Sequence, residues 1–206
     1  MTLIFSTLAA VLPSLLLLRY FYRRDLNPEP RGALVKTFLL GVLIVIPVVI
    51  VVVPLLIFSP RWQDPFWVGL YGALICAAIP EEFFKYLVIT RYSARHPAFN
   101  EPMDGIVYGA TASLGFATLE NIMYVTSNGW GVAISRALTA VPCHACLGAI
   151  LGYYIGQARF RNSKRLARTG LLIAILLHAS YDYPLMVMDA LTPAAGITLV
   201  LVPGLM

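Results

Sequence analysis

Residues 36–58 read KTFLLGVLIVIPVVIVVVPLLIF, a run of 23 residues in which Lys36 alone is charged. A helix needs roughly 20 apolar residues to cross the hydrocarbon core of a bilayer. Five more apolar runs flank this one, at approximately 2–20, 66–89, 105–126, 134–157 and 169–190. Lipid admits only helices or closed barrels, and these runs are too long for barrel strands. The sequence therefore predicts an all-α, polytopic transmembrane helical bundle of six spans, plus a short seventh or interfacial segment at 191–206.

The composition also indicates a lipid environment. Hydrophobic residues make up 59% of the 206 residues, charged residues only 12%, and the mean hydropathy is +0.79. A soluble domain carries about 25% charged residues. The three cysteines lie inside apolar runs, which argues against a secreted disulfide framework. With no internal repeat and no loop long enough to fold alone, residues 1–206 are expected to form a single integral membrane domain.

The basic residues predict the orientation. The loops after the first, third and fifth runs are rich in Lys and Arg, whereas the alternate loops hold only Arg61 and Arg136. By the positive-inside rule, the rich loops are cytoplasmic and the N-terminus is outside, in a multi-pass protein of the plasma membrane. This distribution, with a net charge of +5, also argues against nucleic acid as a partner. No positive residue precedes the first run, so it is read as a retained span and not as a signal peptide.

Seven ionisable residues lie inside four consecutive spans, although each costs roughly 2.5–3.5 kcal/mol to insert there. Function is the default explanation for such groups. They are Glu81, Glu82, Lys85, Glu120, His144, His178 and Asp182.

The first motif is Glu81-Glu82-x-x-Lys85, preceded by Pro80. At helical spacing, Lys85 lies within reach of both carboxylates and can neutralise one of them. Two adjacent carboxylates in a low dielectric split their proton affinities, which suits general acid–base catalysis. Pro80 removes a backbone donor and is expected to loosen the helix. The alternative is that these charges sit at a helix end and snorkel to water.

The second and third motifs lie beside ridges of small residues. Glu120 follows a ridge of Gly105, Gly109, Ser113 and Ala117, and His144 precedes Gly148, Gly152 and Gly156. Such ridges allow close helix packing, so both side chains are expected to face the bundle. A buried carboxylate that only joins helices is the alternative reading of Glu120.

The last motif places His178 and Asp182 four residues apart, so that the carboxylate can orient the imidazole. Either histidine alone suits a packing role, but two histidines facing three acids indicate a site.

Cys143 and Cys146 have the spacing of a metal or redox pair, but they lack a second pair and are read as small apolar fillers. Counting helix rise places Glu81 and Glu82 deeper than the other groups, at about 22–24 Å against about 9–17 Å. A shorter or tilted third span, or a break at Pro80, would reduce this difference.

Together these motifs resemble the PrsW-type intramembrane proteases, which are related to the CAAX prenyl proteases and to a scaffold subunit of gamma-secretase. The resemblance covers about 80–182 and rests on four motifs in family order: EEFFK at 81–85, GFATLEN at 115–121, PCHA at 142–145 and HASYD at 178–182. The prenyl proteases have His where Glu120 stands, which favours the PrsW branch. The resemblance implies cleavage of a single-pass membrane protein, such as an anti-sigma factor or a similar regulator, in stress signalling.

The implied mechanism is attack on a peptide bond by an activated water. One of Glu81 and Glu82 acts as base while the other holds a proton or positions the water, and the two histidines stabilise the oxyanion or protonate the leaving amine. Glu120 and Asp182 orient the histidines, and three further residues support the site: Lys85, Phe116 and Asn121.

The cofactor is left open, as either none or one zinc-like divalent metal ion. An ion would be held by His144, His178 and Glu82 or Glu120. Two other classes also stay open. A proton-coupled transporter buries similar groups but usually shows repeats or broken helices, and a non-catalytic scaffold would not need both glutamates and both histidines.

Overall fold

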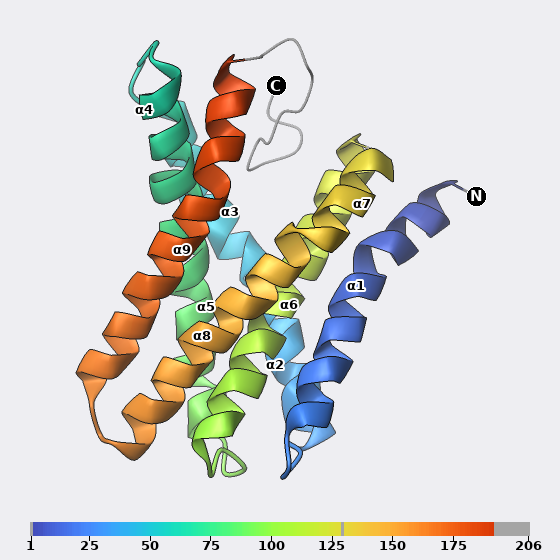
Figure 1. The fold of residues 1–206 in the computed structure, drawn as a ribbon, viewed down its shortest axis with the longest axis vertical. Coiled ribbons are helices and arrows are strands. Elements are labelled where there is room, and N and C mark those ends of the chain that lie inside the picture. Colours follow the sequence, from blue (N-terminus) through green and yellow to red (C-terminus); the bar gives the residue numbers. More distant parts are fainter. Residues whose placement is uncertain (1, 129, 192–206) are drawn as a thin grey trace.

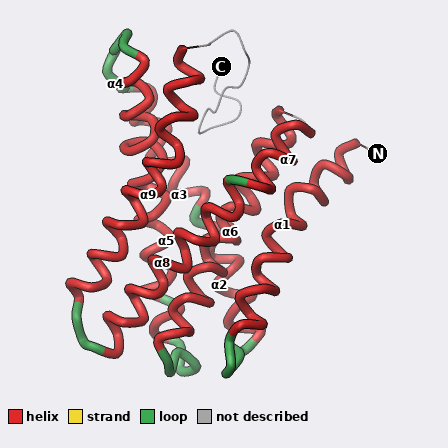
Figure 2. Tube along the Cα trace, in the orientation of Figure 1, coloured by secondary structure: helices red, strands yellow, loops and turns green. Residues whose placement is uncertain are grey.

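A computed structural model describes residues 2–128 and 130–191, and in this part every regular element is a helix (Figures 1 and 2). The α-helices are α1 (Thr2–Arg24), α2 (Arg31–Leu43), α3 (Val45–Ile57), α4 (Pro65–Leu70), α5 (Ile79–Arg91), α6 (Pro102–Asn128), α7 (Trp130–Leu138), α8 (Ala140–Phe160) and α9 (Lys164–Leu191). A π-helix, η1 (Tyr71–Ala78), connects α4 to α5, and a short 3-10 helix, η2 (Ser93–Arg95), follows α5.

Each of the six apolar runs coincides with one of these helices or with consecutive ones. Three helical segments are long and apolar enough to cross a membrane, namely Arg31–Ile57, Trp130–Phe160 and Lys164–Leu191. The prediction of an all-α membrane protein is confirmed in this form. Apart from Leu191, the segment 191–206 lies outside the described residues.

Two of the long segments contain a break that a proline explains. The α-helix is interrupted at Ile44, between α2 and α3, and at Thr139, between α7 and α8. Pro47 and Pro142 follow these positions by three residues. A proline has no N–H for the carbonyl four residues earlier, and its ring clashes with that carbonyl. The breaks therefore follow from the sequence, and the second one lies just before His144.

The helix that carries the glutamate pair changes its hydrogen-bond pattern immediately before the pair. Residues of η1 use i→i+5 bonds, and Pro80 stands in the first turn of α5. Because Pro80 cannot bond to the carbonyl of Cys76, the wider turn replaces the α-helical one there. This matches the expected loosening, and π-helical turns are frequent at functional sites.

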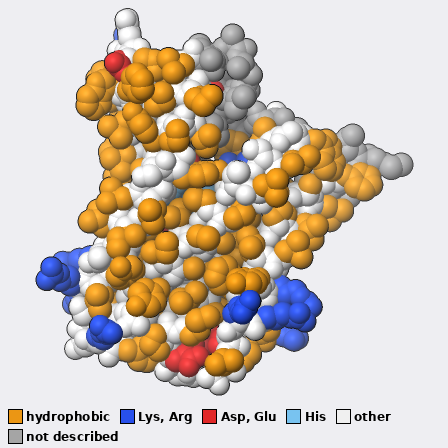
Figure 3. Space-filling model, viewed as in Figure 1, with side chains coloured by type: hydrophobic (Ala, Val, Ile, Leu, Met, Phe, Trp, Pro, Cys, Tyr) orange, Lys and Arg blue, Asp and Glu red, His pale blue; other side chains and the backbone are white. Residues whose placement is uncertain are grey.

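Side chains are distributed as expected for a protein surrounded by lipid. Leu16, Ile50 and Leu172 are more than half exposed on the outer surface, whereas Glu82 and Lys85 are 0% exposed. Figure 3 shows an apolar flank, with Lys and Arg side chains gathered near one end. The C-terminus of α1 and the loop between α8 and α9 lie at that end (Figure 1).

Helices α6 and α8 pack backbone against backbone through their small-residue ridges. A Cβ atom added at Gly152 would lie 1.8 Å from the carbonyl oxygen of Gly105, and one added at Gly109 would lie 2.1 Å from that of Gly148. Only glycine fits at such a distance. The predicted close packing is confirmed, and it sets the position of His144 on α8 relative to Glu120 on α6.

Candidate active site

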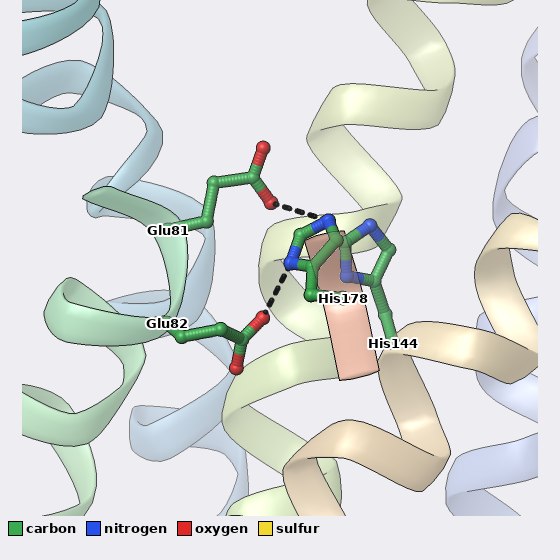
Figure 4. Close-up of side chains that lie close together, drawn as sticks. All are labelled: Glu81, Glu82, His144 and His178. Carbon is green, nitrogen blue, oxygen red and sulfur yellow. Dashed lines mark hydrogen bonds and ion pairs between the residues drawn. The ribbon is translucent and has the colours of Figure 1, made fainter. Parts of the chain in front are cut away.

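Four ionisable side chains meet inside the bundle although they come from three helices. Glu81 and Glu82 lie on α5, His144 on α8 and His178 on α9, and all four are buried. Each offers one ligand atom, and these atoms lie within 4.8 Å of one another. Figure 4 shows both carboxylates pointing toward the imidazole of His178. We call these residues the four-residue cluster.

The expected difference in depth between the glutamates and the histidines is therefore wrong. The count assumed an α-helical rise of 1.5 Å for every residue of the third span. Eight of those residues form η1, whose i→i+5 bonds place more residues in each turn and shorten the helix. This shortening accounts for part of the expected difference, and in the structure the ligand atoms of the carboxylates and the imidazoles lie within 4.8 Å of one another.

Lys85 is the cation of this cluster. Its Nζ donates to Glu82 Oε1 at 2.7 Å and lies 3.5 Å from Glu81 Oε2. It also lies 3.0 Å from His144 Nδ1, which accepts because an ammonium has only donors. Lys85 is 0% exposed, so the alternative that it snorkels to water is wrong.

His178 lies among three carboxylates. Its Nδ1 lies 2.9 Å from Glu82 Oε1, and its Nε2 lies 3.1 Å from Asp182 Oδ2 and 3.9 Å from Glu81 Oε2. Asp182 stands one helical turn along α9, which is the pairing that the i, i+4 spacing predicted. This contact fixes the orientation of the imidazole plane.

His144 is held from the opposite side by a second carboxylate. Its Nε2 donates to Glu120 Oε2 at 3.1 Å, since Nδ1 is the acceptor for Lys85. The same Glu120 oxygen accepts from Arg136 Nη2 at 2.6 Å. Glu120 is thus a partner of His144, and it lies outside the four-residue cluster.

The three predicted supporting residues surround these contacts. Lys85 Nζ lies 4.5 Å from the ring centroid of Phe116, and that ring meets His144 edge-on. Asn121 Oδ1 accepts from Arg136 Nε at 3.1 Å, and its Nδ2 donates to the carbonyl of Ala10 on α1. Phe116 therefore packs on the site, and Asn121 positions Arg136.

Arg136 is the site neighbour that sequence reasoning missed. It is grouped above with the basic residues expected outside, at the start of the apolar run 134–157, but it lies on α7, is 8% exposed, and stacks on Tyr124 with its Cζ 4.0 Å from the ring centroid. One signal for it was available. Arg136 is one of only two basic residues in the loops expected outside, and it stands six residues before a proline that breaks the helix.

The cysteines take no part in the site among the described residues. Cys143 and Cys146 are free thiols, and neither belongs to a group of side chains placed to hold a metal ion. Cys146 is exposed on the outer surface. These positions are consistent with the filler interpretation.

The donor set suits either acid–base chemistry or a divalent ion. Two carboxylates and two imidazoles are typical ligands of catalytic zinc. A metal-ligating imidazole usually donates the N–H of its second nitrogen to a carboxylate. His144 makes this contact with Glu120, and His178 makes it with Asp182. In addition, Glu82 Oε2 is buried and has no hydrogen-bond partner.

Comparisons with known proteins agree on one family. Residues 29–206 match the sequence model of the PrsW family of intramembrane metalloproteases. A protein named Protease PrsW from Geobacillus kaustophilus (strain HTA426) is 40% identical over 185 residues, which cover 86% of this chain and 78% of that protein. The protein of the same name from Bacillus subtilis (strain 168) is 37% identical over 179 residues, covering 85% and 80%. No solved structure shows a significant match to the chain.

Proposed function

This chain belongs to the PrsW family of intramembrane metalloproteases, and on that premise we propose that it hydrolyses a peptide bond of a single-pass membrane protein at the four-residue cluster. It is a peptide hydrolase of the membrane. The proposed substrate is an anti-sigma factor or a similar membrane-anchored regulator. The chain acts as one integral membrane domain, with the reacting groups within 80–182.

The observation that carries the proposal is the meeting of Glu81, Glu82, His144 and His178 within 4.8 Å inside an apolar bundle. Burial of four such groups is costly unless they are paired or used. Two of them are carboxylates from adjacent positions, and each imidazole already has an orienting carboxylate. A packing role alone needs none of this arrangement.

The family name implies a metal ion, and the residues fit one. Glu82 Oε2 is a buried oxygen without a partner, and both imidazoles have the carboxylate contacts that metal-ligating histidines usually have. We propose His144, His178 and Glu82 as ligands. An ion bound to Glu82 and His178 would replace their direct contact, and at His144 Nδ1 it would compete with Lys85. When bound, such an ion polarises the scissile carbonyl and makes water a stronger nucleophile.

Glu81 is the remaining carboxylate and the proposed general base. It is the less tightly paired of the two, with Lys85 at 3.5 Å compared with 2.7 Å for Glu82. Its role is to take the proton of the attacking water at a carboxylate oxygen and deliver it to the leaving amine. Asp182 and Glu120 keep the imidazoles in place throughout. Burial of the site excludes bulk water, which strengthens each of these contacts.

The membrane arrangement is part of the proposal. All six apolar runs span the bilayer, and the basic end of the molecule faces the cytoplasm, so that the N-terminus is outside. The support is the coincidence of each run with helix and the gathering of Lys and Arg at one end (Figure 3).

The test is proteolysis by the purified protein in detergent. A panel of single-pass substrates, including an anti-sigma factor, is incubated with the wild type, Glu81→Gln and Glu82→Gln. We expect both variants to lose cleavage by at least 100-fold, a typical contribution of one acid–base group. The matched control is Asp189→Asn, which removes a carboxylate from α9 outside the site and should leave cleavage unchanged.

Metal content separates the roles of the two glutamates. We expect one zinc-like ion per wild-type chain by mass spectrometry, retained in Glu81→Gln and lost in Glu82→Gln. Cleavage by well-folded Glu81→Gln and Glu82→Gln proteins at the wild-type rate would refute the assignment. Equal metal content in both variants would refute the division of roles between them.

A further inference from the structure

Three acidic side chains lie buried together outside the four-residue cluster. Asp25 and Glu29 belong to the connection between α1 and α2, and Asp104 lies in the first turn of α6. They are 5%, 3% and 0% exposed, respectively. Each offers one carboxylate oxygen, and these oxygens lie within 4.8 Å of one another. We call these three residues the acidic cluster. It lies at the end of the molecule where α1 ends and α6 begins (Figure 1).

The α1–α2 connection holds its two acids by separate hydrogen bonds. Asp25 Oδ1 accepts from the backbone N–H of Asn27 at 3.0 Å. Glu29 Oε2 accepts from the hydroxyl of Tyr108, a fully buried residue one turn along α6 from Asp104. Each of the two carboxylates is thus held by a hydrogen bond to one of its oxygens.

Asp104 is anchored in the same way from the α6 side. Its Oδ2 accepts from the backbone N–H groups of Asn100 and Glu101, at 2.6 and 2.8 Å. The other oxygen, Oδ1, is buried and has no hydrogen-bond partner, and the same is true of Asp25 Oδ2. Two buried carboxylate oxygens from different segments therefore lack a donor.

Within the described residues, no basic side chain forms an ion pair with these acids. None of the ion pairs among the described residues includes Asp25, Glu29 or Asp104. Burial, together with the charges of its two acidic neighbours, raises the pKa of Glu29 to about 7. An uncompensated buried carboxylate costs several kcal/mol. The arrangement is one that a bound cation would stabilise.

We propose that the acidic cluster binds a hard divalent cation, Ca²⁺ or Mg²⁺, which joins the α1–α2 connection to the start of α6. The donors are all oxygen, which is the preference of these ions. Ligands of Ca²⁺ lie at 2.3–2.6 Å from the ion, so two of them are at most about 5 Å apart. The oxygens of the acidic cluster, all within 4.8 Å of one another, meet this limit for Ca²⁺. The site shares no residue with the proposed protease site, so either proposal can fail without the other.

The test measures the melting temperature of the full-length protein in detergent, after chelation and dialysis, against added Ca²⁺ or Mg²⁺. Saturation at about 100 times Kd should raise Tm by roughly 5–10 °C for a chain of this size. Asp25→Asn and Asp104→Asn should each lose most of this rise. Glu101→Gln is the matched control, because it removes an acid of the loop just before α6 that is outside the acidic cluster, and it should keep the rise.

Glu82→Gln separates this site from an ion at the protease site, and it should also keep the rise with Ca²⁺ or Mg²⁺. Isothermal titration with the same ions should give one binding event per chain in the wild type and none in Asp104→Asn. If Asp104→Asn does not fold, the same titration of Asp25→Asn tests the proposal. If neither ion changes the Tm of the wild type, the proposal is overturned. This is the result expected if a shared proton, and not a cation, holds the three carboxylates together. Retention of the rise in both Asp variants overturns it too.

Discussion

At the scale of single residues, the site depends on a chain of contacts that begins at Arg136. Arg136 contacts Glu120, and Glu120 contacts His144. Replacing Arg136 by Gln leaves Glu120 buried beside His144 without its cation, so we expect kcat to fall by roughly 10–100-fold, the usual cost of losing an outer-shell partner. KM should change little, because the hydrogen bonds of Arg136 go to Glu120 and Asn121 and not to the four-residue cluster.

Arg136→Lys should recover only part of this loss, since an ammonium cannot serve both Glu120 and Asn121 in the planar geometry of the guanidinium. Steady-state kinetics of the three proteins checks the expectation. Arg61→Gln, an exposed arginine in the other loop of low basic content, is the control. A kcat for Arg136→Gln equal to the wild type would show that Arg136 does not position the site.

Lys85 gives a second prediction at this scale, about stability. Lys85→Met removes the ammonium that contacts both carboxylates of a fully buried motif. Loss of one partner of a buried pair costs about 3–5 kcal/mol, so we expect a clear drop in Tm. The exposed Lys36, which lies over the Tyr92 ring, is the control, and Lys36→Met should cost at most about 1 kcal/mol. Equal Tm values for the two variants would contradict the conclusion that Lys85 is buried and neutralises the carboxylates.

At the scale of elements, the contact between α6 and α8 determines where His144 lies. Gly152→Ala places a methyl group 1.8 Å from the carbonyl of Gly105, so the helices must separate. We expect both Tm and cleavage to fall. The same substitution at Gly32, which has nothing within 4 Å, should be neutral or stabilising by about 0.5–1 kcal/mol. Thermal unfolding and a cleavage assay on both variants test this, and an active, stable Gly152→Ala protein would be inconsistent with the packing.

Sequence patterns predicted the helices well and the contacts between them only in part. The apolar runs located the helices, because lipid imposes long apolar segments. The cost of burial identified Glu81, Glu82, His144 and His178, and the i, i+4 spacing identified the Asp182 contact. The common depth of these groups was only partly predictable, since a break near Pro80 follows from the sequence but the extent of η1 does not. Asp25 and Asp104 were not recognised either, because acids in short loops are ordinary until the fold buries them.

At the scale of the whole molecule, the proposed orientation is open to direct measurement. In a background with the three native cysteines replaced by alanine, Gln63→Cys places a single thiol in the loop before α4, and Lys164→Cys places one at the first residue of α9, at the opposite end of the bundle. We expect a membrane-impermeant maleimide to label Gln63→Cys on intact cells and Lys164→Cys only after the membrane is opened. The reverse pattern would invert the proposed topology. Labelling of both thiols from one side would exclude an odd number of spans between them.

The π-helix η1 makes the site sensitive to the number of residues as well as to their identity. Because Pro80 still lacks the donor for an α-helical turn, removing one residue from 71–78 leaves the wider turn in place and rotates the following helix by nearly the roughly 100° that an α-helix turns per residue. Glu81 and Glu82 would then face a different neighbour, although every side chain of the site would still be encoded. A single-codon deletion in this apolar stretch should therefore abolish cleavage, while many conservative substitutions there should be tolerated.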